Sequence, residues 1–256
     1  MIKRKIETNL VTKILIISIL ASQITHNFAA TAMIGTMQAI KVDLGLSAVL
    51  MQWLIVAYSI IASSLILISG QLGDVFGHFK LFIIGVVLSL FGCILFCIGT
   101  SASIVMIATI LRGLSTAIIV PGSMASLILI MDKNKMKNIV AIWATSILFG
   151  FGVGPIIGGL CSEVNWRIPY YFCTGFFLIL STILILFRKN FKNIKLEKKI
   201  DLVGSLLLFI GLITLVLLLS EGPYWGWSSA MNISLYAISP IAIILFFYSQ
   251  TKTKDK

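Results

Sequence analysis

Eight long apolar segments make up most of this chain, and they restrict what it can fold into. They lie near residues 13–37, 48–69, 81–99, 103–130, 138–160, 169–187, 202–220 and 231–249. A helix of roughly 20 apolar residues crosses a hydrocarbon core about 30 Å thick, so each segment is long enough to span a membrane. Backbone polar groups in lipid must be satisfied internally, which favours helices over open strands. The sequence therefore predicts an all-α polytopic membrane protein and excludes a soluble fold.

The formal net charge of +11 reflects membrane topology. When the N-terminus is assigned to the cytoplasm, all of the twenty Lys and Arg except Lys41, Arg112 and Arg167 fall in cytoplasmic loops or tails. Positive side chains gather on the cytoplasmic side of membrane proteins. The pattern predicts a multi-pass protein of the cell (inner) membrane with both termini cytoplasmic. We expect the protein to lie in the lipid bilayer and to have no nucleic-acid partner.

The apolar segments are organised as six plus two. A basic cytoplasmic N-terminus, residues 1–12, precedes a six-helix bundle over residues 13–187. A basic cytoplasmic linker follows at residues 188–201. Two further transmembrane helices then occupy residues 202–249, separated by a polar and aromatic break that begins at Glu221, and residues 250–256 form a cytoplasmic tail.

Groups that perform catalysis are scarce in this sequence. It contains four Cys and two His, and no P-loop, GxSxG, HExxH or zinc-ligand spacing occurs. All nine Asp and Glu lie in predicted loops, at segment ends or at the termini. We therefore predict no enzyme activity, no catalytic residue, no metal site and no organic cofactor.

A polar stripe along the first apolar segment is a candidate transport path. His26 lies one turn beyond Ser22, and Gln23, Asn27 and Thr31 follow one another at the same spacing. Polar groups in a spanning helix point into the bundle or into a water-filled cavity. Gln23, His26, Asn27 and Thr31 are therefore candidates for lining a cavity or for coupling. Hydrogen bonding between helices is the alternative, and for His26 we favour it.

The first of two glycine motifs runs from Gly70 to Lys80, in the short polar break expected between the second and third segments. Glycines permit tight turning and close helix approach. Asp74 is expected beside a helix N-terminus or paired with a cation. The candidate cytoplasmic gate consists of Gly70, Leu72, Gly73, Asp74, Gly77 and Lys80.

The second motif lies inside the fifth segment and consists of Gly150, Gly154, Pro155, Gly158 and Gly159. Small residues four apart let neighbouring backbones approach closely. A proline inside a helix removes one hydrogen bond and bends the helix. A generic small-residue packing face is the alternative interpretation.

Both motifs resemble those of the major facilitator superfamily. The Gly70–Lys80 segment is similar to its loop signature G-x-L-[G/A]-D-[R/K]-x-G-[R/K]-[R/K], although Val75, His78 and Phe79 stand where cations are expected. The Gly150–Gly159 segment looks like the antiporter motif of its exporters. Three further segments look like the branch of fourteen-helix drug:proton antiporters: Gln52-Trp53, Asn165-Trp166-Arg167 and Gly226-Trp227.

The resemblance implies a multidrug or small-molecule efflux proton antiporter that works by alternating access. Its substrate would be a lipophilic small molecule and its energy source the proton gradient. That branch inserts two helices between two six-helix halves, so the chain corresponds to the N-terminal six helices plus the two linker helices. We expect a truncated or half-length chain, a separate partner half, or a homodimer. The alternative is a non-transporting membrane partner or a regulatory half-transporter.

Arg112 is the one charge deep inside an apolar segment, where a cation needs a partner or a wet cavity. The family's fourth-helix motif is R-x2-Q-G, and the resemblance puts Arg112 at its glutamine and Thr109 at its arginine. It implies a part in proton coupling for Arg112, and pairing with backbone carbonyls is the alternative. Many members of the branch carry a first-helix aspartate, and Ala29 stands at that position. His26 is then the candidate proton-binding group within a span.

Overall fold

The computed structural model describes residues 10–131, 135–190 and 201–253, and these residues contain eight α-helices and no strand. Each of the eight is long and apolar enough to cross a membrane. The prediction of an all-α polytopic membrane fold is confirmed.

The helices lie close to the predicted segments, and most extend beyond them. They are α1 (Leu10–Asp43), α2 (Ala48–Phe76), α3 (His78–Ile98), α4 (Ala102–Ile130), α5 (Met136–Ser162), α6 (Ile168–Leu186), the 3₁₀ turn η2 (Phe187–Asn190), α7 (Leu202–Trp225) and α8 (Ala230–Thr253). The predicted tails, 1–12 and 250–256, and the linker 188–201 lie partly outside the described residues.

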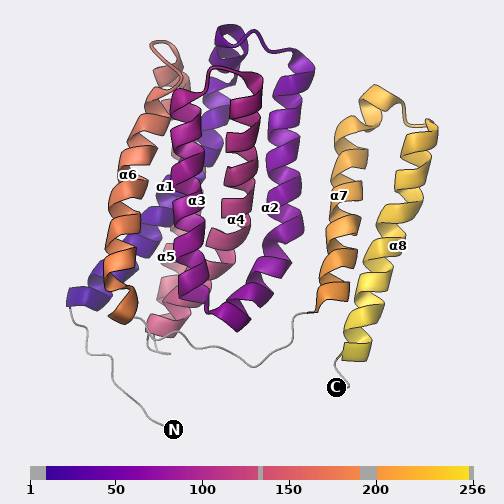
Figure 1. Ribbon diagram of the computed structural model, residues 1–256. Coiled ribbons are helices and arrows are strands. Elements are labelled where there is room, and N and C mark those ends of the chain that lie inside the picture. Colours follow the sequence, from indigo (N-terminus) through magenta and orange to yellow (C-terminus); the bar gives the residue numbers. More distant parts are fainter. Residues whose placement is uncertain (1–9, 132–134, 191–200, 254–256) are drawn as a thin grey trace.

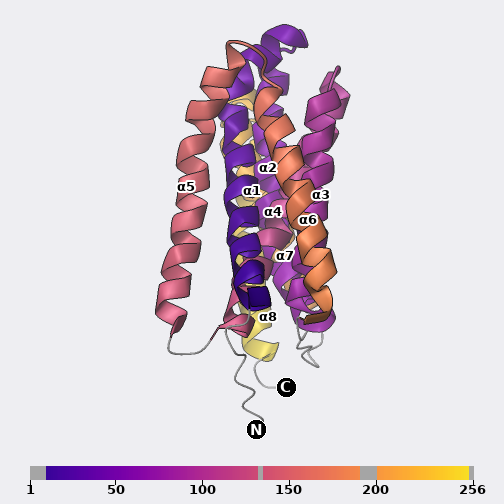
Figure 2. The ribbon, with the colours of Figure 1, turned by 90° about the vertical axis from the view of Figure 1, so that its left-hand side faces the viewer.

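Helices α1 to α6 stand side by side as one bundle, and α7 and α8 form a pair beside α2 (Figure 1). In the perpendicular view α1 lies in the middle of the bundle, with α5 at one edge (Figure 2). Helix α1 begins and α8 ends at the same end of the molecule, which we call the terminal end. Residues 44–47, which connect α1 to α2, lie at the other end, the α1–α2 end.

The interior of the bundle has an apolar cluster toward each end. Toward the terminal end the cluster includes Leu15, Ile19, Phe79, Phe82 and Leu184. Toward the α1–α2 end it includes Ile40, Leu46, Phe96, Val105 and Tyr170. Between them lie buried polar side chains, among them His26, Ser89, Arg112 and Ser115. The bundle therefore carries a polar layer between two apolar ones.

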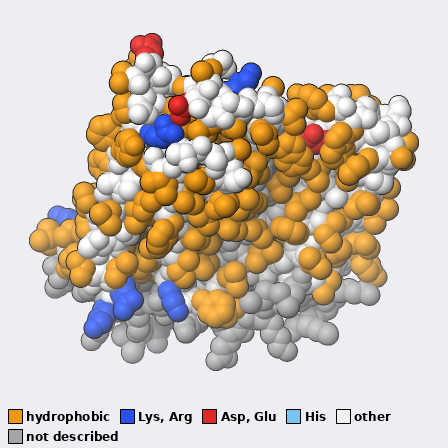
Figure 3. All heavy atoms as spheres, turned by 45° about the horizontal axis from the view of Figure 1, so that its top comes forward, with side chains coloured by type: hydrophobic (Ala, Val, Ile, Leu, Met, Phe, Trp, Pro, Cys, Tyr) orange, Lys and Arg blue, Asp and Glu red, His pale blue; other side chains and the backbone are white. Residues whose placement is uncertain are grey.

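The sides of the molecule are apolar and its charges lie near the ends. In Figure 3 hydrophobic side chains cover the flanks of the helices, and Lys, Arg, Asp and Glu appear toward the two ends. Large exposed residues such as Leu148, Phe172, Ile244 and Phe247 face outward. Such a surface fits a hydrocarbon environment, in which apolar flanks carry no desolvation cost.

The predicted polar break at Gly70–Lys80 is wrong. Helix α2 continues through Phe76, and Gly77 is the single residue between α2 and α3. Gly77 has φ +97°, a backbone conformation that glycine adopts without steric cost. Its N–H donates to Gly73 O at 2.9 Å and its carbonyl accepts from Leu81 N at 3.1 Å, so the chain reverses direction within one residue.

The break predicted to begin at Glu221 is also shorter than expected, because α7 continues to Trp225. Glu221 is therefore helical and only 5% exposed. Gln52 Nε2 lies 3.4 Å from Glu221 Oε1 and donates to Ser220 O at 3.0 Å. This contact with α2 accounts for the buried carboxyl group.

Two glutamines on α2 contact α7, one near each end of α2. Gln52 lies in the first turns of α2 and contacts the far end of α7, as described above. Gln71 lies near the other end of α2, and its Oε1 accepts from Asp201 N at 3.1 Å and from Ser205 Oγ at 3.2 Å. The α7–α8 pair is therefore attached to α2 near both ends of that helix.

Replacing Gly77 with alanine is expected to destabilise the protein, while Gly70→Ala leaves its stability unchanged or slightly raised. A side chain at φ +97° introduces backbone strain of about 1–3 kcal/mol. Gly70 lies inside α2, and a Cβ there meets no atom within 4 Å. Thermal unfolding of the two variants in the same detergent checks this prediction. Equal midpoints for the two variants would contradict the one-residue turn.

Candidate functional site

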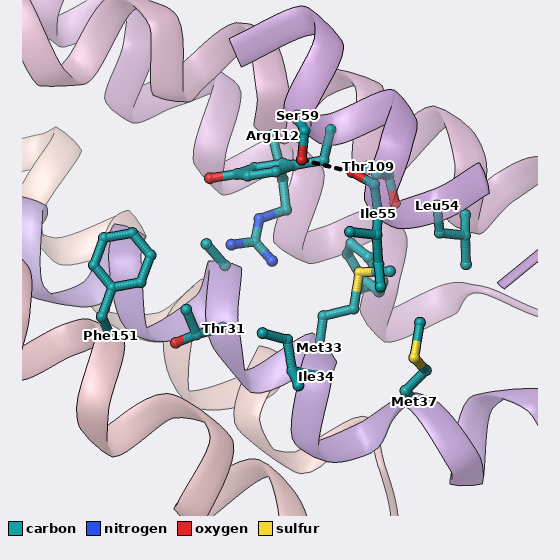
Figure 4. A pocket seen from close by; sticks show the side chains of 13 residues that line it. Thr31, Met33, Ile34, Met37, Leu54, Ile55, Ser59, Thr109, Arg112 and Phe151 are labelled. Atoms are coloured by element: carbon teal, nitrogen blue, oxygen red, sulfur yellow. Dashed lines mark hydrogen bonds between the residues drawn. The ribbon is translucent and has the colours of Figure 1, made fainter. Parts of the chain in front are cut away.

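A cavity of about 180 Å³ lies in the half of the bundle nearer the α1–α2 end. Helices α1, α2 and α4 supply most of its wall, and α3 and α5 each supply one aromatic ring (Figure 4). Its apolar lining is Ala30, Met33, Ile34, Met37, Leu54, Ile55, Phe96 and Phe151. Its polar lining is Thr31, Tyr58, Ser59, Thr109 and Arg112. The cavity is thus an apolar space with a single cation in its wall.

Arg112 is 2% exposed and is held by backbone carbonyls of α1. Its Nη1 donates to Ala29 O at 2.6 Å, and its Nη2 donates to His26 O at 3.4 Å. The guanidinium carbon lies 5.7 Å from the ring centre of Phe96 and 6.0 Å from that of Tyr170. These are the backbone contacts that the sequence offered as the alternative to a coupling role, which itself stays a prediction.

The space for this arginine is created by a glycine on α3. A Cβ at Gly92 would lie 2.6 Å from Arg112 Cγ, so a larger residue would displace the side chain. Figure 4 shows the guanidinium pointing into the space surrounded by Thr31, Met33 and Phe151. Arg112 thus faces the cavity while it is anchored to α1.

His26 is fully buried and joins α1 to α3 and α4. Its Nδ1 is 2.7 Å from Ser89 Oγ, and its Nε2 is 2.8 Å from Thr116 Oγ1. Thr116 Oγ1 also lies 2.8 Å from the Tyr58 hydroxyl, which lines the cavity. On the other side, Ser89 Oγ lies 2.5 Å from Ser115 Oγ. A continuous hydrogen-bonded chain therefore links the cavity wall to the centre of the bundle.

This chain ends on two carbonyl groups: Ser115 donates to Gly85 O at 2.7 Å, and Thr116 donates to Arg112 O at 2.8 Å. Together with the four contacts described above, these two make six hydrogen bonds, and each hydrogen bond needs one hydrogen. A neutral imidazole and the four hydroxyl groups supply five hydrogens, whereas an imidazolium raises the supply to six. Within this arrangement a proton added to the imidazole would have an acceptor, but burial of the ring and, after it, the nearby charge of Arg112 both oppose that proton.

The remaining predicted residues of the polar stripe lie at different distances from the cavity. Thr31 lines it, donates to Asn27 O at 3.0 Å and lies 3.4 Å from Gly150 O. Asn27 is buried outside the lining and donates to Gln23 O at 2.8 Å. Gln23 is also buried, and among the described residues neither its Oε1 nor its Nε2 has a hydrogen-bond partner. A role in transport for Gln23, His26 and Asn27 stays a prediction.

The glycines of the second motif pack against α1. A Cβ at Gly150 would lie 2.6 Å from Ile24 O, and one at Gly158 would lie 2.5 Å from Ala32 O. On α1, a Cβ at Gly35 would lie 2.5 Å from Gly159 N. Helices α1 and α5 therefore meet backbone to backbone, with Pro155 inside α5. The contact has the geometry of a small-residue packing face, and an antiporter role for the motif stays a prediction.

The first motif contains a hydrogen bond between two side chains that sequence reasoning missed. His78 Nε2 lies 2.9 Å from Asp74 Oδ1 across the Gly77 turn. Gly73 leaves room for the imidazole, because a Cβ there would lie 2.6 Å from His78 Cε1. His78 stands where the family signature has a cation, and its imidazole contacts the Asp74 carboxylate. The i, i+4 spacing of the two residues was the available signal.

A second missed cluster closes the α1–α2 end of the bundle. Trp166 Nε1 and Arg167 Nη1 both donate to Asp43 Oδ2, at 2.9 and 3.0 Å. Arg167 Nη2 donates to Gly99 O at 2.6 Å, and its guanidinium lies 4.1 Å from the Trp166 ring centre. These contacts connect the ends of α1 and α3 to the start of α6. They lie at the α1–α2 end, the end of the bundle nearer the cavity.

Comparison with known proteins gives a consistent result. The family model described as Major Facilitator Superfamily matches residues 19–254. The chain is 27% identical over 233 residues to the uncharacterized MFS-type transporter EfpA of Mycobacterium tuberculosis, covering 90% of this chain and 43% of that protein. It is 27% identical to the tetracenomycin C resistance and export protein of Streptomyces glaucescens, covering 85% of this chain and 40% of that protein.

Solved structures show the same arrangement of helices. A peptide transporter POT in complex with sulfate superposes with a TM-score of 0.67 at 16% identity, over 92% of this chain and 51% of that one. At this identity the likeness concerns the fold alone. The chain spans less than half the length of the two curated relatives and about half of the solved transporter.

Proposed function

This chain belongs to the major facilitator superfamily, and from that membership we propose that it forms part of an efflux transporter for a small lipophilic molecule. The observation that carries the proposal is the apolar cavity of about 180 Å³ beside Arg112. Transporters of this kind bind substrate near the membrane midplane and expose the site to each side in turn. A cavity walled by five helices of one bundle supplies one side of such a site.

We also propose that the chain belongs to the fourteen-helix branch and that it works together with a second six-helix half. The α7–α8 pair, attached to α2 after a six-helix bundle, is consistent with a branch that carries two extra helices. A second six-helix half then completes the cavity. It is supplied by a longer polypeptide, a separate partner or a second copy of this chain, and the intact mass of the native product distinguishes the first source from the other two.

Proton coupling is part of the proposal and is assigned to the His26 network. His26 connects to the cavity through Thr116 and Tyr58. A protonated ring can donate to both Ser89 and Thr116, and burial and the charge of Arg112 favour release of that proton again. Arg112 donates to the backbone carbonyl of His26 and faces the cavity, so its charge acts on both the imidazole and the cavity.

We further propose that the terminal end faces the cytoplasm of a cell whose inner membrane holds the protein. Described cations at that end include Lys13, Lys80, Lys135 and Arg188, whereas Lys41 and Arg167 lie at the α1–α2 end. This asymmetry is the one that the positive-inside rule describes.

Everted membrane vesicles from cells that express the native gene product are expected to accumulate a lipophilic dye when their interior is acidified. Collapse of the pH gradient with nigericin should release the dye. Arg112→Met is expected to abolish accumulation, because it removes the charge from the cavity wall. Ser63→Ala, one turn beyond Ser59 on α2 and outside the cavity lining, serves as the control. If dyes of every charge fail to accumulate but another transporter changes rate in the presence of this protein, the regulatory alternative holds.

A further inference from the structure

We infer that the cavity beside Arg112 selects lipophilic anions, molecules with a carboxylate or a similar acidic group on a small apolar body. The inference rests on the proposed function and specifies its substrate class. It is carried by a buried guanidinium in the cavity wall that has no carboxylate partner among the described residues.

The charge of Arg112 lacks a counterion in the part of the chain that the structure describes. The described carboxylates that contact a basic side chain are Asp74, beside His78, and Asp43, beside Arg167, and both lie at helix ends. No described carboxylate lines the cavity. A cation buried in an apolar membrane protein requires a compensating charge or water, so an anion that enters the cavity is stabilised by Arg112.

Arg112 has more N–H donors than there are carbonyl groups bonded to them. A guanidinium has five N–H groups in a planar fork that matches a carboxylate. The hydrogen bonds to Ala29 O and His26 O use two of them. The guanidinium points into the cavity, where an acidic group can accept from the remaining donors (Figure 4). The rings of Phe96 and Tyr170 and the α1 carbonyls hold it in that orientation.

The rest of the wall suits the apolar body of such a molecule. Met33, Ile34, Leu54 and Ile55 surround the space, and unbranched methionine side chains adapt to different shapes. A cation of the same size would face Arg112 at short range in a medium of low dielectric constant, where repulsion is strong. The cavity therefore discriminates by charge as well as by hydrophobicity.

The test uses three probes of nearly identical shape: 2-naphthoate, 2-naphthamide and 2-naphthamidine, which are an anion, a neutral amide and a cation. Binding to the purified native gene product in lipid nanodiscs is measured by equilibrium dialysis. Naphthoate is expected to bind about tenfold more tightly than naphthamide, the gain typical of a hydrogen bond to a charged group. Naphthamidine is expected to bind more weakly than either.

Two variants assign the selectivity to this cavity. Arg112→Gln is expected to remove the preference for naphthoate, whereas Ser63→Ala, on α2 outside the cavity lining, keeps it. Thr109 lies three residues before Arg112 on the same helix face and also lines the cavity. Thr109→Asp supplies a carboxylate beside an intact Arg112 and is expected to abolish the preference, while the isosteric Thr109→Asn retains it. This second pair keeps the test decisive if Arg112→Gln fails to fold.

Two results overturn the inference. Equal binding of naphthoate and naphthamide shows that the cavity selects by hydrophobicity alone. Tighter binding of naphthamidine shows that a carboxylate outside the described residues neutralises Arg112. A preference for naphthoate without vectorial transport leaves the inference standing and refutes the proposed function. Transport of the probes without charge preference does the reverse.

Discussion

Replacing Gly154 with alanine is expected to prevent stable assembly of the bundle. A Cβ at this position would collide with Thr31 Oγ1 and would lie 2.7 Å from Phe28 O and 3.0 Å from Ala32 N. Two of these neighbours are backbone atoms of α1 and have no rotamer to change. Helices α1 and α5 must therefore separate along their contact. Overpacking of a rigid interior costs about 1–3 kcal/mol per site, and Gly154→Ala is expected at or above the top of that range.

Gly152→Ala is the matched control, because a Cβ at Gly152 meets no atom within 4 Å. The two glycines are two residues apart on α5, so both variants change the same stretch of helix by one methyl group. Size-exclusion chromatography and thermal unfolding in detergent are expected to show an unstable or aggregated Gly154→Ala protein and a normal Gly152→Ala protein. Equal stability of the two would mean that α1 and α5 do not pack through this face.

Replacing Ser89 with alanine is expected to shift proton-driven transport to lower pH by about 1–2 units. The substitution removes one hydroxyl hydrogen and two contacts, those of Ser89 with His26 and Ser115. Four contacts then remain, and a neutral His26 with the three other hydroxyls supplies four hydrogens. An added proton on Nδ1 would find no acceptor. The loss of one hydrogen bond to a charged group, about 1.5–3 kcal/mol, corresponds to that shift.

The charged and titratable groups considered around this ring are Arg112 on α4 and Tyr58 on α2, and the substitution leaves both in place. Transport in everted vesicles is measured between pH 5 and pH 8, together with substrate exchange at equal pH on both sides. Ser89→Ala is expected to move the pH profile and to leave exchange intact. His26→Gln is expected to remove the pH dependence and keep exchange. An unchanged profile in both variants would assign His26 to a purely structural role.

The sequence was sufficient for the positions of the helices, because each span is a long apolar segment. It was insufficient for the connections. A segment containing Gly70, Gly73 and Gly77 suggests a flexible break, yet only Gly77 leaves the helical conformation. Glycine content does not reveal which residue has a positive φ. Glu221 was misplaced for a related reason, since its burial depends on Gln52 from a distant segment.

For the candidate site, the sequence identified Arg112 because charge deep in an apolar segment is rare. Its partners are carbonyl groups of α1, and a carbonyl leaves no trace in a sequence pattern. The cluster of Asp43, Trp166 and Arg167 was missed because Asp43 lies more than a hundred residues before the other two. The hydrogen count around His26 likewise required the positions of Ser89 and Thr116 on two other helices.

The attachment of α7 to both ends of α2 has a mechanical consequence. One contact would act as a pivot, whereas the contacts at Gln52 and Gln71, near opposite ends of α2, oppose both tilting and sliding. We expect α7 and α8 to move together with α2, which also packs against α4. Because Tyr58 and Leu54 on α2 form part of the cavity wall, a force on the outer pair displaces one wall of the cavity. Lipids or proteins that press on α8 are therefore expected to change the shape of the cavity without touching it.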